Sequence, residues 1–180
     1  MNATDVITLA TNPPLDRLDV EILARLTDNA RVGVAELASA LGVSRTTVQL
    51  RMRRLEAEGI LLGFQPVIDL TRVGLGVRAT VTLEIDQRVM GAIVDGLRAL
   101  PEVLEVRIQA GREDLLAQVA IGSLEELQRL TASIVAIDGV RKTTSTFTVA
   151  TPVPYRVQPL LDQLTRSAGW GRSTPTPPAE

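Results

Sequence analysis

The residues best suited to chemistry lie between positions 44 and 54, where hydroxyl, amide and guanidinium side chains follow one another. Eight of them share this polar character: Ser44, Arg45, Thr46, Thr47, Gln49, Arg51, Arg53 and Arg54. Guanidinium and amide groups form bidentate hydrogen bonds with the edges of DNA bases, and hydroxyl groups bind phosphate. The first turn of a helix adds free N–H groups, which also bind phosphate. This set therefore predicts contact with double-stranded DNA.

Two other interpretations of the segment stay open. An arginine-rich helix can simply be the solvated face of an ordinary helical bundle. Arg51 and Arg54 could reach the DNA backbone, or two of the arginines could instead pair with Glu56 and Glu58. The pattern of residues does not choose among these roles.

Three predicted helices position this segment. The first begins near position 15 and repeats leucine and isoleucine at helical spacing, with Asp16 as its N-cap. The second covers residues 34–41 and ends at Gly42, because glycine readily adopts the left-handed conformation that follows a helix. The third starts after Ser44 as N-cap and continues to about position 58. Two short helices joined by a tight glycine turn are typical of a helix-turn-helix.

The composition excludes several classes of function. The chain of 180 residues has no cysteine and no histidine, which removes disulfides, thiolate and imidazole metal ligands, and histidine-based catalysis. Lys142 is its only lysine, and the phosphate-binding loop motif is missing. We therefore expect no catalytic residues, no metal and no cofactor. The net charge is −2, so DNA binding has to come from a local patch.

The second half of the chain alternates between strand and helix patterns. Strands are predicted at 79–85, 103–108, 115–120 and 140–149, and helices at 89–100 and 124–137. The order βαββαβ, with a faint internal repeat of helix–turn–strand, predicts a ferredoxin-like arrangement. The whole chain is therefore expected to be α+β.

Between the two halves, residues 61–69 read as an extended strand that Pro66 restricts to a sheet edge, followed by a glycine-containing hinge. From about position 165 the chain is rich in Ser, Thr, Pro and Gly, which predicts disorder. The predicted organisation is a flexible arm (1–14), a helix-turn-helix domain (15–62), a linking strand and hinge (63–76), a βαββαβ domain (77–157) and a largely disordered tail (158–180). With no basic N-terminal stretch and no apolar run of about 18 residues, we expect a cytoplasmic protein without a membrane segment.

At this level of detail the sequence resembles the Lrp/AsnC family of leucine-responsive and asparagine regulators. The resemblance covers roughly residues 15–157 and both predicted domains. The motifs that carry it are Leu15-Asp16-Arg17-Leu18-Asp19, Ala35-Glu36-Leu37-Ala38, Leu41-Gly42-Val43-Ser44, Arg51-Met52-Arg53-Arg54-Leu55-Glu56, Gly59-Ile60 and Gly63-Phe64.

The resemblance implies a winged helix-turn-helix joined to a domain that binds an effector and assembles the protein. It implies homodimers, often higher oligomers, in which the linking strand (here Leu62 to Ile68) helps to pair the protomers. Pseudo-palindromic promoter DNA and an amino-acid effector are the implied partners, which would associate the protein with the nucleoid. The alternative is an architectural DNA-binding protein of low sequence specificity. Some tetrapyrrole decarboxylases share the fold, but their chemistry is expected to need histidines, which this chain lacks.

The family's effector site uses a Gly-Asp-x-Asp turn and residues near the start of the final strand. Its counterpart here is Gly111, Arg112, Glu113 and Asp114, together with Thr143, Thr144 and Ser145. Arg112 replaces the first acidic residue of the turn. We hypothesise a ligand with an additional carboxylate, or a changed or absent effector. A polar hairpin turn exposed to water is an equally simple interpretation of residues 111–114.

Overall fold

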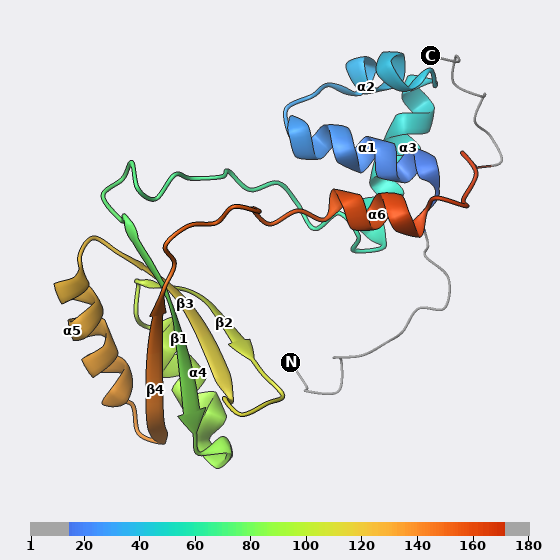
Figure 1. The fold of residues 1–180 in the computed structure, drawn as a ribbon. Helices are drawn as coiled ribbons and strands as arrows, with labels where there is room; N and C mark the ends of the chain where they lie inside the picture. Colours follow the sequence, from blue (N-terminus) through green and yellow to red (C-terminus); the bar gives the residue numbers. More distant parts are fainter. Residues whose placement is uncertain (1–14, 172–180) are drawn as a thin grey trace. The chain divides into compact units, whose positions relative to one another are not determined.

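The computed structural model describes residues 15–171, so the predicted arm at 1–14 and the end of the predicted tail lie outside the described residues. The described residues form two compact units. The first contains residues 15–66 together with 154–171, and the second contains residues 67–153 (Figure 1).

The first unit contains the three predicted helices: α1 (Arg17–Asp28), α2 (Val34–Leu41) and α3 (Arg45–Ala57). Their ends are set by the predicted residues. Asp16 caps α1 in a capping box with Asp19, and Ser44 caps α3 by accepting from the N–H of Thr47. Gly42 follows α2 with φ of +66°, which confirms its predicted role in the turn.

A small aliphatic core holds these helices together. It consists of Leu18, Ile22, Leu26, Leu37, Ala38, Leu41 and Val48. Burial of large aliphatic side chains stabilises a fold by about 1.5–3 kcal/mol each, so this core accounts for the packing of α1 and α2 on α3.

The first unit also contains a helix that was not predicted. Residues Gln158–Leu164 form α6, which packs against α1 (Figure 1). The expectation of a largely disordered tail from position 158 is therefore wrong for residues 158–164. Trp170 also packs against the aliphatic core. The physical reason is tertiary contact: a seven-residue helix is marginal alone, but docking on α1 stabilises it.

The second unit has the order β1 (Val77–Ile85), η2 (Gln87–Val89), α4 (Met90–Arg98), β2 (Val103–Ile108), β3 (Leu115–Ile121), α5 (Leu124–Val135) and β4 (Val140–Phe147). The antiparallel sheet has the strand order β2-β3-β1-β4 (Figure 1). This order and the βαββαβ sequence confirm the ferredoxin-like prediction.

The two helices of this unit cover one face of the sheet. Inward residues of β1 and β3 alternate with outward ones, and they form one cluster with residues of α4 and α5. The opposite face carries polar side chains such as Thr80, Thr82 and Gln118, and no described helix of this unit packs on it.

The segment predicted as a linking strand is not a strand in the structure. Residues 62–69 make no ladder, and Leu62, Val67 and Ile68 are 90%, 101% and 60% exposed. A strand needs a neighbour to satisfy its N–H and C=O groups, and the described residues of this chain supply none there. The boundaries also shift, because residues 154–157 belong to the first unit and residues 67–76 to the second.

Candidate functional site

One face of α3 presents polar side chains that make no polar contact within residues 15–171. These residues are Arg45, Thr46, Gln49 and Arg53, and all four are exposed. Helical geometry places Thr46, Gln49 and Arg53 on the side opposite Val48 and Leu55, which point into the core. This exposed face can form hydrogen bonds with a large external ligand without breaking any contact inside the unit.

Leu50 lies on the same face and was missed by the sequence analysis. Its side chain is 60% exposed, although it is large and apolar. An apolar group on a DNA-reading helix can contact the methyl group of thymine. The sequence could have indicated this exposure, because the helical spacing places Leu50 away from Val48 and Leu55, which point into the core.

Ser44 and Thr47 have a different task. The Ser44 hydroxyl accepts from the Thr47 N–H at 3.0 Å, and the two hydroxyl groups are 2.8 Å apart. Both side chains therefore fix the first turn of α3. The remaining N–H groups of that turn stay at its exposed end, where they suit an anion such as phosphate.

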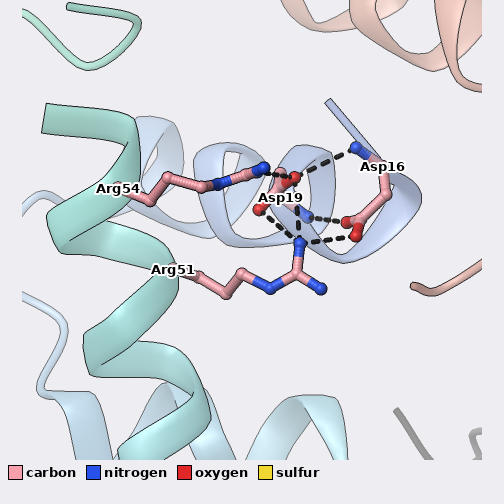
Figure 2. A network of polar contacts seen from close by, with 4 residues as sticks. All are labelled: Asp16, Asp19, Arg51 and Arg54. Carbon is pink, nitrogen blue, oxygen red and sulfur yellow. Dashed lines mark hydrogen bonds and ion pairs between the residues drawn. The ribbon is translucent and has the colours of Figure 1, made fainter. Parts of the chain in front are cut away.

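Arg51 and Arg54 turn inward to α1 (Figure 2). Arg51 Nη1 lies 2.5 Å from Asp16 Oδ2 and 3.2 Å from both carboxylate oxygens of Asp19. Arg54 pairs with Asp19 as well. The Asp19 side chain is fully buried, so its charge depends on these two guanidinium groups for compensation.

This network corrects one interpretation of the sequence: the acidic partners are Asp16 and Asp19, not Glu56 and Glu58. Burial lowers the pKa of the Arg51 guanidinium, but its hydrogen bond to Asp16 and the charges of Asp19 and Asp16 outweigh burial and raise it. Arg51 is therefore a permanent cation that joins α3 to the first turn of α1.

In the second unit, Asp114 ends the turn predicted to bind an effector. Its carboxylate accepts from the Ile85 N–H at 2.8 Å and from Gln87 Nε2 at 2.7 Å. The hydrogen bonds from Gln87 and Ile85 lower its pKa. Asp114 is thus an anion that joins the turn to the end of β1. Arg112 is exposed and makes no polar contact within residues 15–171.

The predicted residues of β4 divide between the two faces of the sheet. Thr143 and Ser145 pair with Leu83 and Val81, whose side chains are buried under the helices, so they face α5. The Ser145 hydroxyl lies 3.4 Å from that of Thr131. Thr144 pairs with Thr82 on the opposite face. The strand β1 separates these residues from the turn, so the seven predicted residues do not form one cavity in a single chain.

The part of the chain that the structure describes has no helix long and apolar enough to cross a membrane. It also has no group of three or more acidic residues placed to hold a metal ion.

Comparison with known proteins assigns both units. The model of the AsnC-type helix-turn-helix domain matches residues 15–56, and that of the Lrp/AsnC ligand binding domain matches residues 78–158. The HTH-type transcriptional regulator AldR of Mycolicibacterium smegmatis is 34% identical over 118 residues, which are 64% of this chain and 69% of that protein.

Solved structures agree with this assignment. The structure of AsnC from E. coli has a TM-score of 0.75 and 27% identity, and the match covers 81% of this chain and 99% of that one. The leucine response regulatory protein LrpA of Mycobacterium tuberculosis has a TM-score of 0.64 and 31% identity, covering 77% and 95%. With both units matched in the same order, the chain belongs to the Lrp/AsnC family of helix-turn-helix transcriptional regulators.

Proposed function

We propose that α3 enters the major groove of promoter DNA and reads it with Arg45, Thr46, Gln49, Leu50 and Arg53. The observation that carries this proposal is the division of the helix into two sets of residues. The outward set makes no polar contact inside the unit, whereas Arg51 and Arg54 are ion-paired with α1. Of the eight residues that the sequence analysis selected, we therefore assign base recognition to four, and Leu50 joins them.

The other four residues hold the reading helix in place in this proposal. Ser44 and Thr47 fix its first turn, which leaves the backbone N–H groups there for a phosphate. Arg51 and Arg54 act as positioning residues, because their contacts set the angle of α3 on α1.

We further propose that the protein acts as a homodimer or a larger homo-oligomer. The segment 62–68 exposes Leu62, Phe64, Val67 and Ile68, and its backbone groups have no ladder. A second copy of the same segment would supply both an apolar contact and hydrogen bonds. A dimer also presents two reading helices, as a pseudo-palindromic site requires. In this proposal the protein acts on promoter DNA, and we therefore expect it in the cytoplasm, at the nucleoid.

For the second unit we propose a small-molecule effector that carries an additional carboxylate, such as a dicarboxylic amino acid. Arg112 offers an unpaired guanidinium, and Asp114 offers a carboxylate for an ammonium group. Thr143, Thr144 and Ser145 would contribute only where protomers meet, because β1 separates them from the turn within one chain.

The reading face is tested by replacing Arg53. Binding to a labelled duplex from upstream of the protein's own gene is measured by fluorescence anisotropy, with random DNA as competitor. Loss of one base contact costs about 1–3 kcal/mol, so Arg53→Ala is expected to weaken binding to this duplex by about five- to 150-fold. Arg53→Lys separates the contribution of the positive charge from that of bidentate hydrogen bonding, because lysine keeps the charge but not the bidentate geometry.

Arg129→Ala is the matched control, since Arg129 is an exposed arginine on α5 of the other unit. It removes the same charge and should leave binding unchanged. If Arg53→Ala bound the duplex as tightly as Arg129→Ala, the proposed reading face would be wrong. Dissociation of the Arg53→Ala oligomer would equally refute the outward placement of this residue.

A further inference from the structure

The helix α1 is buried on two opposite sides, and only one of them faces the aliphatic core. Leu18 and Ile22 point into that core. Val20 lies about 160° away from both around the helix, yet it is only 2% exposed. The C-terminal segment lies on this side, because α6 packs against α1. Val20 also lines a cavity of about 350 Å³ together with Arg17, Glu21, Asp162, Thr165 and Arg166.

Hydrogen bonds near both ends of the C-terminal segment attach it to α1. Gln158 Nε2 donates to the carbonyl of Val20 at 3.4 Å, and the Arg17 N–H donates to the carbonyl of Gly169 at 3.3 Å. Thr165 is 2% exposed, and its hydroxyl is satisfied by the carbonyl of Leu161 at 2.9 Å. Burial of this kind is expected of a residue in a packed interface.

Trp170 connects the segment to the core itself. It packs against the aliphatic cluster of α1, α2 and α3, and the Arg17 guanidinium lies 5.6 Å from the centre of its ring. Contact of an arginine with an aromatic face stabilises a structure by about 0.5–1 kcal/mol at exposed sites. Trp170 thus joins the C-terminal segment to the core of the three helices.

Gly171 lies directly against the ion pair that joins α1 to α3. A Cβ atom added at this position would be 2.5 Å from Arg51 Nη2 and 2.6 Å from Asp16 Oδ2. The backbone φ of +84° also favours glycine. The backbone of Gly171 therefore lies beside Arg51, one of the two arginines that position the reading helix, and beside its partner Asp16.

We propose that residues 158–171 are a built-in support of the DNA-binding unit, in which Trp170 and Gly171 act as positioning residues for α3. The support acts through Arg51 and Asp16, so it sets the angle of the reading helix as well as the stability of the unit. Apart from residue 158, the segment lies outside both matched domain models. The inference rests on the proposed use of α3 as the reading helix.

Two shortened variants of the full chain test the support. One ends at Val157 and lacks the segment, and the control ends at Gly171 and keeps it. Binding to the duplex from upstream of the protein's own gene is measured well below the unfolding midpoint of each variant. Residues that couple to a site without touching its ligand change affinity by about 0.5–2 kcal/mol, so the Val157 variant should bind about two- to 30-fold more weakly. The control should bind like the full chain.

Point variants keep the test valid if the Val157 variant does not fold. Gly171→Val keeps the Trp170 side chain, but it places a Cβ against the ion pair and strains the backbone at φ of +84°, so we expect weaker binding by a folded protein. Trp170→Phe should retain more affinity than Trp170→Ala, because phenylalanine keeps an aromatic face. A segment that only stabilises the unit would lower the unfolding midpoint and leave the affinity of the folded protein unchanged.

The outcomes separate this inference from the proposed function. If Arg53→Ala weakens binding and the folded C-terminal variants do not, the support is refuted while the reading face stands. If the C-terminal variants weaken binding and Arg53→Ala does not, the segment acts elsewhere than on the reading helix, and both proposals fail. Absence of DNA binding by the unmodified protein would also overturn both.

Discussion

Replacing Asp19 with asparagine should destabilise the DNA-binding unit strongly, although the two side chains have nearly the same shape. Asp19 is fully buried, and its carboxylate faces the guanidinium groups of Arg51 and Arg54. The variant keeps an oxygen that can accept from the Asp16 N–H, so the capping box is largely retained. What it removes is the negative charge that compensates two cations.

The expected loss of stability depends on how well water can solvate each guanidinium group in the variant. Removing one partner of a buried ion pair costs about 3–5 kcal/mol. Here the side chains of Arg51 and Arg54 are 18% and 37% exposed, and Arg51 keeps Asp16. We therefore expect about half of that cost, about 2 kcal/mol. For a domain of this size the unfolding midpoint should fall by about 8–16 °C.

Trp170 makes the measurement specific to this unit. It is the only tryptophan of the chain, and it packs against the core of the DNA-binding unit. Urea unfolding followed by its fluorescence should show a midpoint lower by about 1–2 M for Asp19→Asn. Glu21→Gln is the control, since Glu21 lies on the same helix without an ion-pair partner among residues 15–171. Equal midpoints for the two variants would refute the assigned role of the network.

Three further predictions concern the second unit and the assembly. The pKa of Asp86 is lowered to about 2, mainly by hydrogen bonds from Arg88, so its contribution to stability is present above pH about 4 and is lost as the pH falls towards 2. The thermal midpoints of wild type and Asp86→Asn should therefore converge over that range. A difference between the midpoints that stays constant would contradict this. Calorimetry should show tighter binding of glutamate than of leucine, weakened by Asp114→Ala, whereas tighter binding of leucine would remove the role of Arg112. Light scattering should give at least twice the mass of one chain, reduced by Ile68→Asp; the mass of a single chain for the wild type would exclude the proposed dimer.

The parts of the fold that the sequence predicted correctly depend on neighbouring residues. Asp16 and Ser44 cap the helices that they precede, and Gly42 takes the left-handed conformation at the turn. The strand β1 and residues 115–119 of β3 alternate between buried and less buried residues, because the helices cover only one face of the sheet. Such signals are local, so they can be read without knowing the tertiary structure.

The partners of Arg51 and Arg54 could not be found in this way. Glu56 and Glu58 are closer in sequence and lie on the same stretch of chain, whereas Asp19 is 32 and 35 residues away. Only the packing of α1 on α3 brings the charges together. An indication was present in α1, where Asp19 follows Leu18 and lies on a side of the helix that becomes buried.

Two segments differ in the single chain from what the sequence predicted, and both depend on a neighbour that the sequence does not name. Residues 62–68 have the composition of a strand, but a strand forms only beside another strand, and one copy of the chain provides no neighbour there. Residues 158–164 were assigned to a largely disordered tail, but α1 provides a surface on which they form a helix. The useful signal was in α1 and not in the tail, because Val20 is an apolar residue on the side of α1 that the three-helix core does not cover. An apolar residue on the outer side of a helix thus indicates either a partner or a further segment of the same chain, and in this protein a further segment lies there.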